Sequence, residues 1–221
     1  MTEGTLLNII LGTGNPDKLR ELSLLLEGLP LKFMPLRDVH LGRLPDENGA
    51  THYANASLKA KHWSSEGGGL AVATLMAARD EGLPLPVACV AISPWADMTC
   101  SAASFNSKAG WQPNIERGRL KGLADAYLAG QDDRTPLASP IFGDLAGLPP
   151  LLIHVGSEEA LLDDSRALHN RAQGAGVETT LEVWDDMVHV WHNYHHRLSE
   201  ARDAVARIGD FLTAAWQAKA A

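Results

Sequence analysis

The sequence has too few cysteines, basic residues and long apolar runs for several classes of protein. Its two cysteines, Cys89 and Cys100, are not enough for a disulfide framework or a four-ligand zinc site. No apolar run approaches the roughly 20 residues that cross a bilayer, so we expect no membrane span. Lys and Arg total 19 against 27 Asp and Glu, and the resulting net charge of −8 argues against a nucleic-acid partner.

The first residues, MTEGTLLNIIL, lack the basic region and the small-residue cleavage site of a secretory signal. We therefore expect a cytoplasmic location. The chain has 221 residues, enough for one α/β domain or two small ones. Hydrophobic residues make up 45% of the sequence, so an ordinary buried core is available and wholesale disorder is excluded.

Short apolar runs alternate with stretches of helical composition along most of the chain. The predicted strands are residues 6–11, 31–36, 87–92, 151–155 and 179–184, and the predicted helices are residues 15–28, 53–63, 70–82, 115–128, 161–172 and 197–216. Such alternation is typical of a mostly parallel sheet with helices on both faces. No repeat or low-complexity linker marks a domain boundary. We therefore expect residues 1–221 to form a single composite α/β domain with a mostly parallel sheet of about five strands.

The N-terminal part carries its own set of motifs. They are TGNxxK at residues 13–18, ENGAT at 47–51 and NAxLKA at 55–60. With these motifs the stretch from about residue 7 to 62 resembles the start of the inosine/xanthosine triphosphate pyrophosphatases, which remove non-standard nucleotides. We therefore treat residues 1–62 as a pyrophosphatase-like βαβ segment.

This resemblance implies that Asn15 and Lys18 hold nucleotide phosphates, with Lys59 as a further phosphate-binding candidate. A glycine-containing turn that opens a helix presents free N–H groups, which suits phosphate. The alternative, a capped helix with solvated lysines, is the one we favour. The later acidic residues of that family are missing, and Glu47 alone does not make a magnesium site. We expect polyphosphate binding without turnover at most, and no metal or cofactor.

A different set of motifs begins at about residue 65. They are GGGLA at 67–71, SPWAD at 93–97, YLAG at 127–130, PLASP at 136–140, GLPPLLI at 147–153, VGSEEALLDD at 155–164 and MVHVW at 187–191. In this order, residues 65–221 are similar to the hormone-sensitive-lipase-like esterases of the α/β-hydrolase fold. The resemblance implies a truncated α/β-hydrolase fold that lacks the cap, the first strands and the His-Gly-Gly-Gly oxyanion loop. The chain then looks like a fusion of segments from two families.

The esterase resemblance implies a nucleophile, an acid and a base in the chain order serine, carboxylate, histidine. Aligned on the three glycines, Ser65 falls on the nucleophile, while the motifs GSEEALLDD and DMVHVW place Glu159 on the acid and His189 on the base. The alternative for Glu159 is a solvated loop carboxylate. The nearby Asp163 and Asp164 are further acid candidates, which we interpret as caps of the following helix.

The surroundings of Ser65 depart from the family pattern. Trp63 stands in place of a glycine and Glu66 in place of an alanine, and the preceding residues have helical rather than strand composition. Ser64 or Ser65 as a helix N-cap is therefore a competing interpretation. For the oxyanion we predict the N–H of Glu66 as one donor, with the turn Gly12-Thr13-Gly14 in place of the missing glycine loop.

Three further histidines, at positions 192, 195 and 196, lie on one stretch. Their spacing is not a recognised zinc pattern, so we interpret them as a solvated helix start. The function that we expect is a serine carboxylesterase acting on small short-chain acyl esters, since loss of the cap opens the site. The alternatives are a nucleoside triphosphate pyrophosphatase remnant that binds polyphosphate and a folded fusion without efficient activity. Dimerisation is one way to cover an exposed sheet edge, so a homodimer is also considered.

Overall fold

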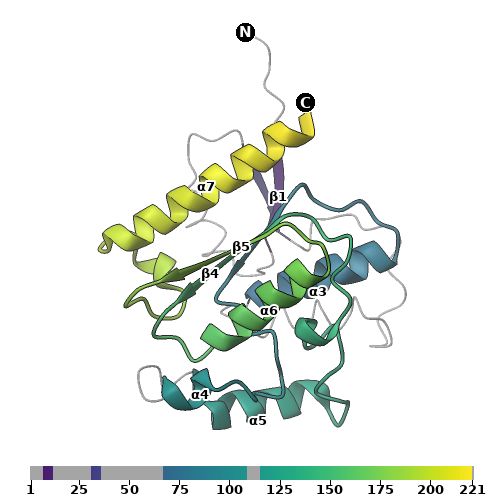
Figure 1. The fold of residues 1–221 in the computed structure, drawn as a ribbon, viewed down its shortest axis with the longest axis vertical. Helices are drawn as coiled ribbons and strands as arrows, with labels where there is room; N and C mark the ends of the chain where they lie inside the picture. Colours follow the sequence, from purple (N-terminus) through teal and green to yellow (C-terminus); the bar gives the residue numbers. More distant parts are fainter. Residues whose placement is uncertain (1–6, 12–30, 36–66, 109–114, 221) are drawn as a thin grey trace.

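The computed structural model describes residues 7–11, 31–35, 67–108 and 115–220 (Figure 1). The described strands are β1 (Leu7–Leu11), β2 (Leu31–Pro35), β3 (Cys89–Ile92), β4 (Leu151–Gly156) and β5 (Thr179–Trp184). The described α-helices are α3 (Gly67–Asp80), α4 (Ser104–Ser107), α5 (Arg117–Leu128), α6 (Leu162–Gly174) and α7 (Ser199–Ala220), and the short 3-10 helices are η3 (Pro140–Phe142) and η4 (Trp191–Tyr194). Across these residues, no helix combines the length and apolar character that a bilayer crossing requires.

The main sheet consists of three parallel strands in the order β3-β4-β5. Ile92 pairs with His154, and Gly156 pairs with Trp184, so the three strands end at the same edge of the sheet. The central strand β4, LLIHVG, is buried along its whole length. This burial accounts for its largely apolar character, because a central strand in a covered parallel sheet has no solvent face.

Strands β1 and β2 form a second parallel pair, with Leu7 opposite Leu31. Both strands were predicted from their apolar runs, and both are confirmed within one residue at each end. Among the described residues, however, hydrogen bonding groups the strands as two and three. The α/β class with parallel strands is confirmed, whereas one continuous sheet of about five strands is not found in this part of the chain.

Helices cover both faces of the three-stranded sheet, as the alternating pattern predicted (Figure 1). On one face, Ala91 and Ile153 pack with residues of α3 and α6, among them Val72 and Leu168. On the other face, Leu152 packs with residues of α7. Neighbouring strand residues point to opposite faces, so a single strand such as β4 supplies side chains to both layers.

The glycines at the start of α3 allow this helix to lie directly against the end of β3. A Cβ on Gly68 would come within 2.7 Å of the Ile92 carbonyl oxygen, and one on Gly69 within 2.0 Å of the Trp95 carbonyl oxygen. Real Cβ atoms do not approach backbone oxygens so closely, so only glycine fits at these two positions. The first turn of α3 is therefore fixed beside the residues that follow β3.

Candidate functional site

Two of the predicted site residues, Glu159 and His189, are in contact. Glu159 follows β4 and His189 follows β5, and these strands are neighbours in the parallel sheet. The Nδ1 atom of His189 lies 2.9 Å from Oε2 of Glu159. The carboxylate is fully buried, and the imidazole side chain is 8% exposed. The carboxyl ends of adjacent parallel strands commonly gather site residues from distant parts of a chain.

The contact with Glu159 orients the imidazole of His189. A carboxylate accepts hydrogen bonds and donates none, so the nitrogen that faces it, Nδ1, carries a proton. In the neutral ring the basic nitrogen is then Nε2, at the opposite side of the imidazole. This arrangement is the one that a general base needs when a carboxylate holds it in place.

The other oxygen of Glu159 is held by two donors. Oε1 accepts a hydrogen bond of 2.7 Å from the Ser93 hydroxyl and one of 2.7 Å from the Gly156 N–H. A buried carboxylate is costly unless hydrogen bonds compensate it, and these donors together with His189 do so. Glu159 is therefore a buried, fully engaged carboxylate, and the alternative of a solvated loop carboxylate is wrong.

Ser93 is a residue of this site that the sequence analysis did not identify. It directly follows β3, is fully buried, and accepts a hydrogen bond of 3.2 Å from the Val190 N–H. Its motif, SPWAD, was one of those that indicated the family resemblance, but no role was assigned to its serine. A polar residue immediately after a buried strand, at the edge where Glu159 and His189 were expected, is the signal that points to it.

Asp163 and Asp164 do not cap α6, so that interpretation is wrong. No side chain caps this helix, whose first turn contains both residues. Asp164 Oδ2 accepts hydrogen bonds from the N–H groups of Ala96 and Asp97, each at 3.0 Å. Asp163 Oδ2 accepts one from the Ser104 N–H. Burial raises the pKa of Asp164 well above its usual value. Both carboxylates thus connect α6 to the segment that follows β3.

His192 does not belong to a solvated helix start, which corrects the prediction for that position. It is 4% exposed, and its Nε2 lies 3.1 Å from Nδ1 of His154, a fully buried residue of β4. The rings of Trp184 and Trp191 pack around this imidazole pair. Burial lowers the pKa of His154 to about 4 and that of His192 to about 3. His196, in contrast, is exposed.

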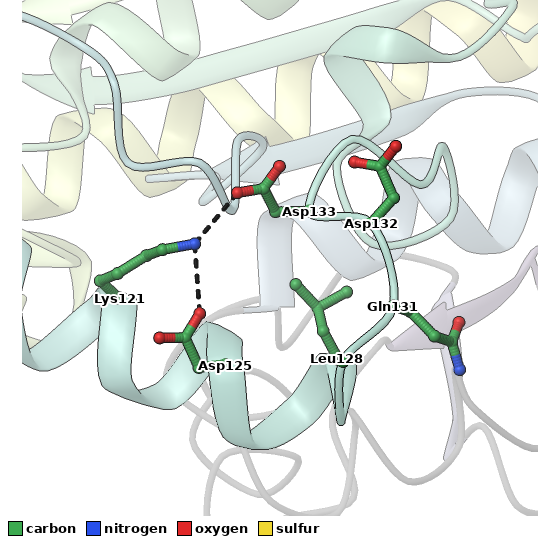
Figure 2. Close-up of a pocket in the computed structure, with 7 residues that line it drawn as sticks. Lys121, Asp125, Leu128, Gln131, Asp132 and Asp133 are labelled. Atoms are coloured by element: carbon green, nitrogen blue, oxygen red, sulfur yellow. Dashed lines mark hydrogen bonds and ion pairs between the residues drawn. The ribbon is translucent and has the colours of Figure 1, made fainter.

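No group of three or more metal-ligating side chains occurs in the described part of the chain. A cavity of about 400 Å³ lies elsewhere, at α5 and the loop after it (Figure 2). There Lys121 contacts Asp125 at 3.2 Å and Asp133 at 3.0 Å, and these hydrogen bonds raise the pKa of Lys121. Neither Glu159 nor His189 lines this cavity, so it is not part of the site described above.

The remaining predicted site residues lie outside the described residues. They are Ser65, Glu66, Gly12, Gly14, Asn15, Lys18 and Lys59. The described chain resumes at Gly67, two positions after Ser65, and the first turn of α3 lies beside β3.

Comparison with protein families gives two matches on this chain. The family of the alpha/beta hydrolase fold matches residues 64–193, which include Glu159 and His189. The Ham1 family matches residues 9–86, in agreement with the pyrophosphatase-like resemblance of the N-terminal part. The two matches overlap at residues 64–86, a range that includes the whole of α3.

Two curated relatives carry acetyl-hydrolase names. The chain is 54% identical over 151 residues to an acetyl-hydrolase of Streptomyces hygroscopicus, covering 68% of this chain and 50% of that protein. It is 33% identical over 148 residues to the putative acetyl-hydrolase LipR of Mycobacterium tuberculosis, covering 66% of this chain and 47% of that protein. The chain thus spans about half the length of these relatives.

Solved structures resemble nearly the whole chain. An esterase/lipase from an uncultured bacterium superposes with a TM-score of 0.77 at 37% identity, covering 97% of this chain and 78% of that one. An esterase from the bacterial hormone-sensitive lipase family gives a TM-score of 0.74 at 39% identity, covering 94% and 75%.

Proposed function

The chain belongs to the family of the alpha/beta hydrolase fold, and from this premise we propose that it is a serine carboxylesterase acting on short-chain acyl esters. The observation that carries the proposal is the contact of 2.9 Å between Nδ1 of His189 and Oε2 of Glu159. It supplies an oriented base and its acid at the carboxyl edge of a parallel sheet. Such a pair activates a hydroxyl nucleophile in hydrolases of this fold.

We propose Ser65 as the nucleophile. It lies two positions before Gly67, and two residues of extended chain span at most about 7 Å. The glycines of the first turn of α3 lie against the segment that follows β3, where Ser93 contacts Glu159. This proximity of the start of α3 to the Ser93–Glu159 contact is the structural observation that favours Ser65 as the nucleophile.

In the proposed reaction, Nε2 of His189 takes the proton of the Ser65 hydroxyl as Oγ attacks the ester carbonyl carbon. The tetrahedral intermediate collapses, the alkoxide leaves with the proton from His189, and an acyl-serine remains. Water then attacks the acyl-serine by the same route and releases the acid. We propose that the N–H of Glu66, with the Gly12–Gly14 turn, binds the oxyanion.

The preference for short acyl chains is supported by the names of related proteins. Two curated relatives are named acetyl-hydrolases, and a related structure at 36% identity is that of EstE5 soaked with p-nitrophenyl butyrate. We therefore expect p-nitrophenyl acetate and butyrate to be hydrolysed with a higher kcat/KM than esters of long-chain acids.

The decisive experiment combines turnover with covalent labelling. We expect the protein to hydrolyse p-nitrophenyl butyrate and to react with a fluorophosphonate probe, with the label mapped to Ser65. Ser65→Ala should abolish both the reaction and the label, whereas the neighbouring control Ser64→Ala should retain them. A label on another serine, or turnover that survives in Ser65→Ala, would remove Ser65 from the mechanism.

A second candidate function is supported by the Ham1 match over residues 9–86. It is binding of a nucleoside polyphosphate by Asn15, Lys18 and Lys59, without turnover. Calorimetric titration with inosine triphosphate in the presence of magnesium tests it, with Lys18→Ala as the weakened variant. Absence of heat in the parent protein would exclude this candidate, and pyrophosphate release would instead indicate the pyrophosphatase.

A further inference from the structure

The hydroxyl of Ser93 lies between the acid and the segment that carries the base. Its Oγ donates to Oε1 of Glu159 at 2.7 Å and accepts from the N–H of Val190 at 3.2 Å. Val190 immediately follows His189. One buried hydroxyl therefore contacts the acid directly and also contacts the residue next to the base. Ser93 itself follows β3 and is fully buried.

The direction of both hydrogen bonds is determined by their partners. A carboxylate oxygen accepts, so the single hydroxyl hydrogen points to Glu159. A backbone N–H donates, so it uses a lone pair of the same oxygen. Oε1 thus accepts hydrogen bonds from the Ser93 hydroxyl and the Gly156 N–H, while Oε2 faces Nδ1 of His189. Two donors on one oxygen fix the rotation of the carboxylate about its last bond.

The backbone conformation at position 93 would suit glycine better than serine, which indicates that the serine hydroxyl has a function. Ser93 has a φ of 45° and Val190 a φ of 53°, both in the left-handed region that favours glycine. Glycine would relieve the backbone strain at position 93 and keep the N–H that donates to the His154 carbonyl. What glycine lacks is the hydroxyl. Strain held at such a position by its surroundings is typical of functional sites.

We propose that Ser93 is a positioning residue for the acid–base pair: its hydroxyl sets the carboxylate plane of Glu159 and anchors the peptide that follows His189. This role rests on the proposed esterase function, because Ser93 acts through His189 as the base. Without the hydroxyl, Oε1 loses one donor and the Val190 N–H loses its acceptor. The imidazole then samples orientations in which Nε2 does not meet the nucleophile, while the substrate contacts are unchanged.

The test compares Ser93→Gly with Ser93→Ala. Both variants remove the hydroxyl, but Ser93→Gly also relieves the backbone strain, so a serine with a purely structural role predicts that Ser93→Gly keeps the parent kcat even if it is less stable. Positioning predicts that kcat for p-nitrophenyl butyrate falls at least tenfold in both variants while KM stays within about twofold. Ser165→Ala is the matched control, because its buried hydroxyl donates to the carbonyl of Leu161, the N-cap residue of α6. That variant should keep the parent kcat.

A second readout is independent of turnover. The proton on Nδ1 of His189, held by Glu159, should give a low-field imidazole resonance in the NMR spectrum that is lost in His189→Gln. We expect this resonance to broaden or disappear in Ser93→Gly although the protein still unfolds cooperatively. An unchanged resonance and an unchanged kcat in Ser93→Gly would overturn the proposal. A parent protein without turnover, whose resonance still responds to Ser93→Gly, would overturn the esterase function and leave the positioning role standing.

Discussion

Two histidines that are three positions apart, His189 and His192, face opposite kinds of partner. His189 faces the carboxylate of Glu159 at 2.9 Å, whereas His192 faces the imidazole of His154 at 3.1 Å. A carboxylate stabilises a ring that gains a proton, and a second buried imidazole does not. The difference shows that the facing atom, rather than the residue type or its burial, separates a candidate base from a core residue.

We call His189 with Glu159 the first pair and His192 with His154 the second pair. The largest effect on activity is expected when the carboxylate of the first pair is replaced. In Glu159→Gln the amide no longer fixes the tautomer of His189 or stabilises the imidazolium, so kcat for p-nitrophenyl butyrate should fall by about 10³-fold or more. His189→Gln should show a loss of similar size. A steady-state assay measures both variants, and if Glu159→Gln retained more than a tenth of the parent kcat, the acid assignment would be wrong.

The second pair predicts a dependence of stability on pH. Burial lowers the pKa values of His154 and His192 from 6.5 to about 4 and about 3. Because both folded pKa values lie below the unfolded one, the unfolded chain binds protons first as the pH falls. The stability present above about pH 6.5 is therefore lost as the pH falls, down to about pH 4 for His154 and about pH 3 for His192. At about 1.4 kcal/mol per pH unit, the loss is roughly 3 kcal/mol for His154 and roughly 5 kcal/mol for His192.

Urea unfolding at a series of pH values measures this slope. The exposed control His196→Asn should keep the parent slope, and a variant with both His154 and His192 replaced by glutamine should flatten it. Equal slopes in the parent and the double variant would show that the imidazole pair does not govern the acid sensitivity.

Removal of one member of the second pair should affect stability and not turnover. His192→Leu leaves a nitrogen of the buried His154 without its partner, which costs about 1–3 kcal/mol of unfolding free energy. We expect kcat to stay within a few-fold of the parent value, because His189 keeps its contact with Glu159. Parallel urea titration and p-nitrophenyl butyrate assays separate the two effects, and a kcat loss as large as that of His189→Gln would contradict the separation.

The smallest effect is expected at the carboxylate beside His154. Glu182 Oε2 lies 3.2 Å from Nε2 of His154, and the Glu182 side chain is 23% exposed. Glu182→Gln removes a negative charge beside a neutral imidazole, so the unfolding free energy should change by less than about 1 kcal/mol. A much larger destabilisation would mean that His154 is charged in the folded protein, which would reverse the contrast between the two pairs.

The sequence predicted most of the regular fold and part of the site. Strand β5 was predicted at its observed bounds, because an alternating run between turn residues is a local signal. The four-residue helix α4 and the 3-10 helices were missed, since such short pieces have no periodicity of their own. Glu159 and His189 were predicted from motifs, and their contact follows from adjacent parallel strands.

Other parts of the site depend on contacts between distant segments. Asp164 was misinterpreted as a helix cap because its actual partners, Ala96 and Asp97, come from a loop that precedes it by more than 60 residues. His192 lies in a polar stretch, and its packing against Trp191 and the distant His154 buries it. The role of Ser93 was hidden for the same reason, because its two partners follow other strands.

The bridging hydroxyl has a consequence for protein engineering. Segments following three different strands meet at Ser93, so none of them is an independent module. Replacing only the His189 segment keeps the contact with Ser93 only if the new segment turns in the same way at position 190. A productive exchange would have to move all three segments together, or retain a serine at position 93 and the left-handed turn at position 190.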